Sequence, residues 1–130
     1  MEITNLTRQK IDEKDLKRVA KKTIKILGKK GLENLSLVFA CDARMKALNK
    51  KYRQRNRATD ILSFEGLNEI VICLPQAARQ AKELKTPLLD ELKRLLIHGI
   101  VHLKGYEHEH GGKEAEKMQK IENKILAKLK

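Results

Sequence analysis

One segment of the chain reads Leu95-Leu-Ile-His98-Gly-Ile-Val-His102-Leu103. As a helix it would be apolar on nearly every side, which is typical of a helix buried at the centre of a domain. A Thr-Pro pair at 86–87 precedes it in the order of a helix start, a capping residue followed by proline in the first turn. The pattern therefore predicts a buried central helix over 87–104 that carries both histidines of the segment.

These two histidines are four residues apart, so on a helix they project from the same side about one turn apart. Gly105 can take a positive φ and end the helix, which lets the chain turn back toward it. His108 follows three residues later and can supply a third nitrogen. Three imidazoles with an open fourth position are typical of catalytic zinc, whereas structural zinc is usually closed by four protein ligands. We expect His98, His102 and His108 to bind one Zn²⁺ ion, with water as its fourth ligand.

Two other interpretations of the histidines are open. The same spacing occurs in metzincin peptidases, but these have a glutamate after the first histidine as general base, and this chain has Gly99 there. A metallopeptidase is therefore disfavoured, since its usual proton acceptor is missing. Histidines that only pack in a core would leave unpartnered imidazoles in an apolar helix, at about 1–3 kcal/mol each. His110, beside two glycines, is expected to be exposed to solvent rather than a ligand.

Phosphate chemistry suits such a site better than peptide hydrolysis. An ion held by three neutral histidines keeps its double charge, lowers the pKa of bound water to about 7 and withdraws charge from a phosphodiester oxygen. A phosphoryl transition state needs cationic donors more than a base. Arg53, Arg55 and Arg57 lie in a basic run, 50–57, and their guanidinium groups can bind phosphate through two parallel hydrogen bonds. The alternative is that this run is only a solvated basic surface.

The composition favours a polyanionic partner. The 130 residues include 29 Lys and Arg against 17 Asp and Glu, a formal net charge of +12, which favours nucleic acid. Lysine-rich surfaces also occur as a trait of heat-stable proteins. Aromatic residues make up only 3% of the chain, so base stacking is not expected as the main binding mode. No apolar stretch reaches membrane-spanning length and no signal peptide is recognisable, so we expect no membrane partner and a cytoplasmic location.

The remaining pattern predicts a single α+β domain over residues 1–130, with a small mixed β-sheet packed with helices. Cys41 and Cys73 each end an apolar run and are expected to be buried strand residues rather than a disulfide. Further helices are expected from helical spacing of apolar residues, and strands from short β-branched runs. The helices are expected over 12–29, from 42 to the basic run, over 75–84 and over 113–129, and the strands over 35–40, 61–64 and 69–74.

Three blocks of the chain resemble the YbeY family of bacterial endoribonucleases. The family signature H-G-x-x-H-L-x-G-Y-D-H is similar to residues 98–108, with Glu107 in place of the aspartate. The patterns L-N-x-x-Y-R and T-D-V-L-S-F resemble residues 48–53 and 59–64, and I-V-I-C with a following Ala-rich helix resembles residues 70–81. The blocks stand in the family's order and span most of the chain.

The resemblance implies a zinc site at His98, His102 and His108, and it places Arg53 at the position of the family's functionally important arginine. It implies single-strand-specific endoribonuclease activity, maturation of the 3′ end of 16S ribosomal RNA and a role in ribosome quality control. The partners implied are ribosomal RNA, the small ribosomal subunit, a small-subunit ribosomal protein and a ribosome-assembly GTPase. The main alternative is a ribosome-assembly module that binds RNA without catalysis and whose metal only braces the fold.

Overall fold

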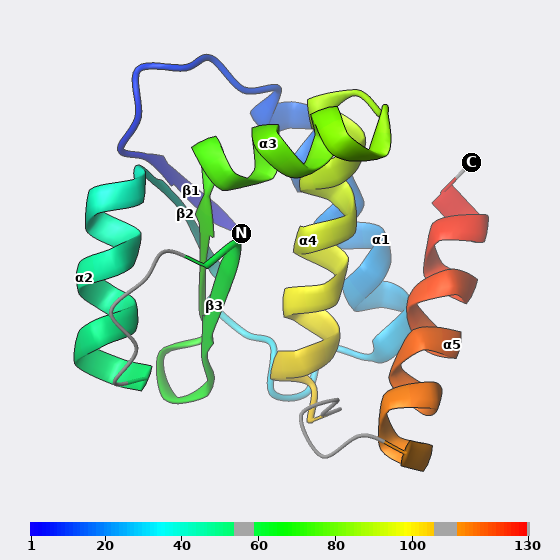
Figure 1. The fold of residues 1–130 in the computed structure, drawn as a ribbon. Coiled ribbons are helices and arrows are strands. Elements are labelled where there is room, and N and C mark those ends of the chain that lie inside the picture. The colour runs from blue at the N-terminus through cyan, green and yellow to red at the C-terminus, as the bar shows by residue number, and fades with distance from the viewer. Residues whose placement is uncertain (54–58, 106–111, 130) are drawn as a thin grey trace.

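A computed structural model describes residues 1–53, 59–105 and 112–129 of the chain (Figure 1). Within these residues, no helix is long and apolar enough to cross a membrane. The elements in chain order are β1 (Glu2–Asn5), α1 (Glu13–Leu27), β2 (Ser36–Ala40), α2 (Asp42–Arg53), β3 (Ile61–Phe64), a short 3₁₀ turn (Glu65–Leu67), β4 (Glu69–Cys73), α3 (Leu74–Leu84), α4 (Leu88–Leu103) and α5 (Gly112–Leu129).

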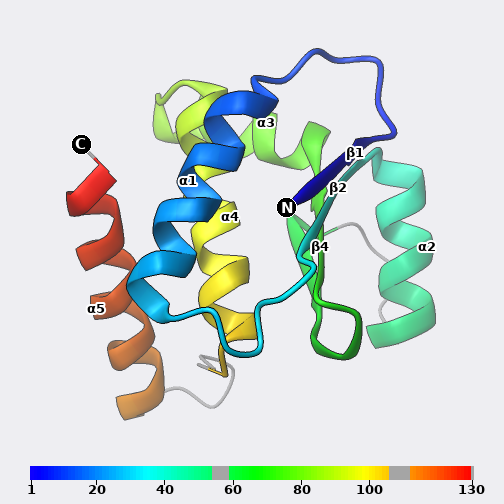
Figure 2. The ribbon, with the colours of Figure 1, turned by 180° about the vertical axis from the view of Figure 1, so that it is seen from behind.

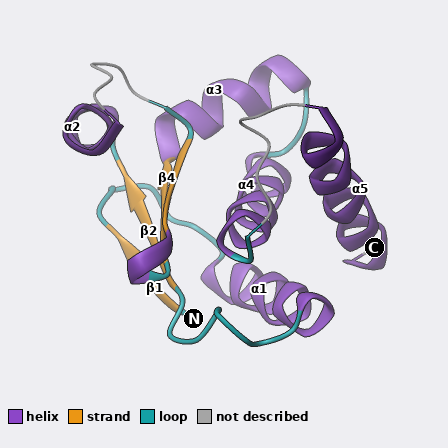
Figure 3. Cartoon of the chain, turned by 90° about the horizontal axis from the view of Figure 1, so that it is seen from below, coloured by secondary structure: helices purple, strands orange, loops and turns teal. Residues whose placement is uncertain are grey.

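The four strands form one sheet in the order β1-β2-β4-β3. Strands β1, β2 and β4 run parallel to one another, and the edge strand β3 pairs antiparallel with β4. Helix α2 covers one face of this sheet, while α1 and α4 cover the other (Figures 1 and 3). Seen from behind, α5 lies beside α1 and α4 on the side away from the sheet (Figure 2). The expected α+β class and small mixed sheet are confirmed.

The larger of two hydrophobic cores lies between the sheet and the helices α1, α4 and α5. Leu16 of α1, Ile72 of β4 and Ile100 of α4 are fully buried in it. A smaller core on the other face of the sheet holds Met45 of α2 and Leu62 of β3. Because α4 contributes buried residues along most of its length, the prediction of a buried central helix is confirmed.

The C-terminal end of α4 is held by hydrogen bonds from the residue that caps it. Lys104 Nζ donates hydrogen bonds to the backbone carbonyls of Gly28 (3.2 Å) and Lys30 (2.6 Å), in the connection that follows α1. Gly105 then takes φ +110°, a conformation that L side chains rarely adopt, and the helix stops as expected. The C-terminal end of α4 is therefore tied to the connection that follows α1.

Two details of the fold differ from the sequence-based expectations. Strand β1 was not predicted, because its four residues alternate only between exposed and half-buried; pairing with β2 makes it a strand. Cys41 is exposed, because β2 ends at Ala40 and α2 begins at Asp42, so the prediction that Cys41 is a buried strand residue is wrong. Cys73 is buried at the end of β4 as expected, and burial raises the pKa of its thiol to about 11. Both cysteines are free thiols.

Candidate metal centre and its surroundings

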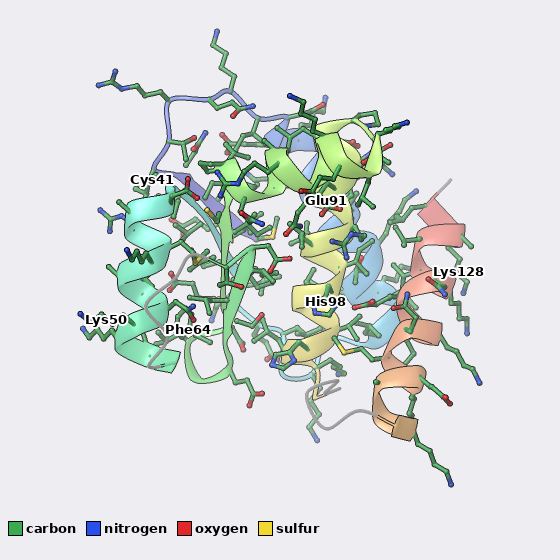
Figure 4. All side chains as sticks on the ribbon, in the orientation of Figure 1. Cys41, Lys50, Phe64, Glu91, His98 and Lys128 are labelled. Atoms are coloured by element: carbon green, nitrogen blue, oxygen red, sulfur yellow. The ribbon has the colours of Figure 1, made fainter. Side chains whose placement is uncertain are left out.

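His98 and His102 lie one turn apart on α4, and both are half-buried. In Figure 4 the labelled His98 lies on α4, between the strand β3 on one side and α5 on the other. His108, Glu107 and His110 lie outside the described residues. Within residues 1–53, 59–105 and 112–129, no three His, Cys, Asp or Glu side chains gather into a possible metal site. The structure thus brings two of the three expected ligands together, and the third stays a prediction.

The position after His98 has little room for a side chain. A Cβ atom on Gly99 would lie 3.0 Å from Cδ1 of both Ile61 and Ile70, and 3.2 Å from Cγ2 of Ile70. Helix α4 can pack this closely against β3 and β4 because residue 99 is glycine. The glutamate that a metzincin carries at this position would point into an apolar contact with the sheet, where an unpaired charge is costly. Packing therefore adds a second argument against a peptidase.

His98 contacts a carboxylate from another helix. Its Nδ1 atom lies 2.5 Å from Oε1 of Glu122 on α5, and Glu122 is only 8% exposed. Since a carboxylate oxygen accepts, Nδ1 donates the hydrogen bond, and in a neutral ring the lone pair is then on Nε2. A carboxylate on the far ring nitrogen is the usual partner of a metal-binding histidine. The donor set at His98 and His102 therefore fits a divalent transition metal.

Glu122 is not among the residues predicted from the sequence, although the sequence carries a signal for it. Glu122 interrupts the apolar side of α5, four residues after Met118 and three before Ile125, and both of these are buried. An acidic residue on the buried side of an amphipathic helix needs a partner. The sequence shows that such a partner must exist but not which residue it is.

A second buried carboxylate lies two turns before His98 on α4. The Glu91 side chain is 1% exposed and accepts hydrogen bonds from Arg94 Nε (2.6 Å), Arg94 Nη2 (2.8 Å) and Gln80 Nε2 (2.7 Å). Burial alone would raise the pKa of Glu91, but the bonds from Arg94 and Gln80 outweigh it and hold the pKa below its ordinary value. Glu91 in turn raises the pKa of Arg94, and the charges of Asp60 and Glu122 add to this effect. This side of α4 thus carries paired charges of both signs, which the sequence analysis missed.

Arg53 is the last residue of α2, and its side chain lies outside the described structure. The residue before it, Tyr52, packs edge-on against Phe64 of β3, with ring centroids 5.2 Å apart and an angle of 75° between the rings. Strand β3 also contacts α4, since Ile61 faces Gly99. The end of α2 that carries Arg53 and the histidine helix α4 therefore both pack against β3, but on opposite faces of the sheet. Arg55 and Arg57 lie outside the described residues.

Residues 2–130 match the family model described as Endoribonuclease YbeY. The chain belongs to the YbeY endoribonuclease family. Relatives named Endoribonuclease YbeY include one from Aquifex aeolicus, 38% identical over 98% of this chain and 90% of the relative. Another, from Thermodesulfovibrio yellowstonii, is 45% identical over 74% of this chain and 67% of the relative, and one from Persephonella marina is 34% identical over 92% and 85%. The solution structure of TM1509 from Thermotoga maritima aligns with a TM-score of 0.62 and 28% identity, covering 98% of this chain and 91% of that one.

Membership in the YbeY family confirms the resemblance drawn from the three sequence blocks. In the structure these blocks lie next to one another. Residues 48–53 end α2, and residues 59–64 lead into and form β3. Residues 70–81 form most of β4, which pairs with β3, and most of α3. The described part of the signature, residues 98–105, ends α4 and begins the turn after it. The YbeY patterns are thus separate in sequence but meet around β3.

Proposed function

We propose that this chain is a zinc-dependent endoribonuclease that cleaves single-stranded RNA. We further propose that it acts in maturation of the 3′ end of 16S ribosomal RNA and in ribosome quality control. Membership in a family of endoribonucleases supports the reaction class. The observation that supports the metal most directly is the contact between His98 and Glu122, because it favours the ring form in which Nε2 can bind an ion.

Three histidines would hold the ion: His98 and His102 on α4, and His108 beyond the turn at Gly105. Zinc with water as a fourth ligand is our choice, although imidazole also suits nickel, copper and iron. When bound, such an ion supplies Lewis acidity, which stabilises negative charge on a phosphodiester oxygen and makes water a stronger nucleophile near neutral pH. The absence of a side chain at Gly99 fits a reaction that does not depend on the peptidase base.

Arg53 is proposed to bind the phosphate that is cleaved. A guanidinium group makes two parallel hydrogen bonds to phosphate oxygens and keeps its charge at any physiological pH, so it can stabilise the negative charge of the transition state. The resemblance to the family supports this role, and the contact of Tyr52 with Phe64 attaches the end of α2 that carries Arg53 to β3.

The RNA backbone is proposed to be held by exposed lysines as well. Helices α1 and α5 lie side by side (Figure 2) and carry exposed lysines along their solvent sides, among them Lys17, Lys21, Lys25, Lys120 and Lys124. Contacts of this kind bind phosphate without reading the base sequence.

The proposed partners are the small ribosomal subunit with its RNA, a small-subunit ribosomal protein and a ribosome-assembly GTPase, all in the cytoplasm. Their support is the resemblance to the YbeY family together with the net charge of +12, which favours association with ribosomal RNA. Co-sedimentation with small subunits from cell extract would test the assembly with the ribosome.

Cleavage of a single-stranded RNA by identically prepared variants tests the reaction. We expect His102→Ala and Arg53→Ala to lose about a hundredfold or more of the wild-type rate, as is typical when one charge-stabilising group is removed. Arg44→Ala is the matched control, because Arg44 is an exposed arginine earlier on α2. Metal content is determined on every batch, so that loss of the ion and loss of the arginine are told apart.

Equal residual cleavage in the wild type and both site variants would mean that a contaminating nuclease is responsible. If Arg53→Ala also kept all activity in cells while metal removal unfolded the chain, the protein would instead be an RNA-binding assembly module braced by its metal.

A further inference from the structure

Glu122 is a buried acid on a helix that otherwise packs through apolar residues. It is 8% exposed and lies on the side of α5 that faces the core, between Met118 and Ile125. Its Oε1 atom lies 2.5 Å from His98 Nδ1, across the contact between α5 and α4. A carboxylate in such a place destabilises the fold unless it is hydrogen-bonded, and the contact with His98 supplies such a bond.

Glu122 hydrogen-bonds His98, and its charge also acts on an arginine of the same helix. The charge of Glu122 acts on Arg94, one turn before His98 on α4, and Arg94 is charged at any physiological pH. Arg94 nevertheless gives its Nε and Nη2 hydrogen bonds to Glu91. Arg94 is thus engaged by Glu91, and the hydrogen bond of Glu122 is with His98. Glu122 instead binds a ring whose protons can be on either nitrogen.

The hydrogen bond determines what the ring can do. A neutral imidazole carries one proton, and the carboxylate holds that proton on Nδ1, so the lone pair is on Nε2. The same bond fixes the rotation of the ring. Each of these effects favours binding of a cation by Nε2.

We propose that Glu122 is the positioning residue for His98, holding the ring in the orientation and protonation form in which Nε2 binds the divalent ion. This inference rests on the proposed function, because it takes His98 to be a metal ligand. It assigns a role to α5, which lies outside the three sequence blocks that carry the family resemblance.

Two variants of Glu122 and one control test the proposal. Glu122→Gln keeps an oxygen that accepts from Nδ1 but removes the charge, while Glu122→Ala removes both. Glu116→Gln is the control, because Glu116 is an exposed acid on the same helix. Thermal unfolding of each metal-free variant first establishes that it is folded.

The first measurement is made on the metal-free protein. Long-range ¹⁵N–¹H correlation spectra of the His98 ring, recorded at a pH where the ring is neutral, show which nitrogen carries the proton. We expect the proton on Nδ1 in the wild type, in Glu122→Gln and in Glu116→Gln, and a mixture of both forms in Glu122→Ala. A wild-type ring with its proton on Nε2 would overturn the proposal.

The second measurement is zinc affinity by competition with a chelator. We expect Glu122→Ala to bind zinc about 10–100-fold more weakly than the wild type, as is typical when the partner of a ligating histidine is removed. Glu122→Gln should lie between the two, and Glu116→Gln should match the wild type. A folded Glu122→Ala protein that binds zinc as tightly as the wild type would show that Glu122 only joins two helices. This result would overturn the proposal.

The two proposals fail in different ways. If the wild type shows the expected spectra and affinities but cleaves no RNA, the endoribonuclease proposal is wrong and the role of Glu122 is supported. If the wild type cleaves RNA but Glu122→Ala keeps its zinc affinity, the endoribonuclease proposal is supported and the proposed role of Glu122 is wrong.

Discussion

Gly99 lacks a side chain, and this affects both packing and chemistry on α4. Ile61 and Ile70 occupy the space that a Cβ atom would need, so α4 lies against the sheet at this point. On the neighbouring sides of the same helix stand His98, which contacts α5, and Ile100, which is fully buried. A single residue thus sets how close the histidine helix comes to β3 and excludes a carboxylate from that position.

Gly99→Ala is expected to destabilise the fold. Forcing a methyl group into this contact costs about 1–3 kcal/mol, which exceeds the gain of about 1 kcal/mol from replacing glycine by alanine within a helix. We expect a net loss of about 1 kcal/mol in the free energy of unfolding, measured by urea denaturation, and a larger loss for Gly99→Val. Gly66→Ala is the matched control, because a Cβ there meets no atom within 4 Å. A Gly99→Ala protein more stable than the wild type would show that Ile61 and Ile70 can move aside at little cost in free energy.

At the scale of elements, carboxylates hold the helices to one another. Asp15 of α1 binds Lys93 of α4 at 2.8 Å, and Asp42 of α2 binds Arg79 of α3 at 2.8 Å. The hydrogen bond from Lys93 lowers the pKa of Asp15, and that from Arg79 lowers the pKa of Asp42. Glu91, buried on α4, also has a lowered pKa. All three carboxylates therefore stabilise the fold only while they are ionised.

Glu91→Gln is expected to remove part of this dependence on pH. Because the folded-state pKa of Glu91 lies below the 4.5 of an ordinary glutamate, its contribution is complete well above pH 4.5 and is lost as the pH falls through the folded value. The variant should be about 1.5–3 kcal/mol less stable than the wild type at neutral pH, since hydrogen bonds to a charged group are lost.

The difference between Glu91→Gln and the wild type should vanish as both are acidified, in urea denaturation series from neutral pH to well below pH 4.5. Glu83→Gln, which alters an exposed acid on α3, should follow the wild type throughout. A difference that stays constant on acidification would show that Glu91 contributes through packing rather than through its charge.

The prediction of elements succeeded where one segment carried a strong pattern. Helix α4 was expected over 87–104 and is found over Leu88–Leu103, because its apolar residues need burial on almost every side. Strand β1 was missed because it has no such pattern and exists through its hydrogen bonds to β2. Local sequence predicts an element whose residues must be buried. It does not predict a strand that forms only because a neighbouring strand hydrogen-bonds to it.

The whole molecule is strongly basic, with exposed lysines on α1 and α5 and a net charge of +12. Binding to single-stranded RNA should therefore weaken with salt, because each bound phosphate releases counterions. With about four phosphates contacted, affinity should fall about fiftyfold when the salt concentration rises fourfold.

Replacing Lys17, Lys21 and Lys25 together by glutamine should reduce the salt dependence if α1 contacts the RNA. The slope of log affinity against log salt, measured by fluorescence anisotropy, gives the number of phosphates released. A slope near zero for the wild type would contradict electrostatic binding of the RNA backbone.

The sequence by itself determined the buried histidine helix, the placement of His98 and His102 one turn apart on it, and the family, because burial pattern and residue spacing are local properties of the chain. Only the tertiary structure decided that Glu122 meets His98 and that Gly99 meets Ile61 and Ile70, since these contacts join segments 24 to 38 residues apart in sequence. Spacing shows which side of a helix a residue occupies, whereas the partner on that side depends on how the helices and the sheet pack.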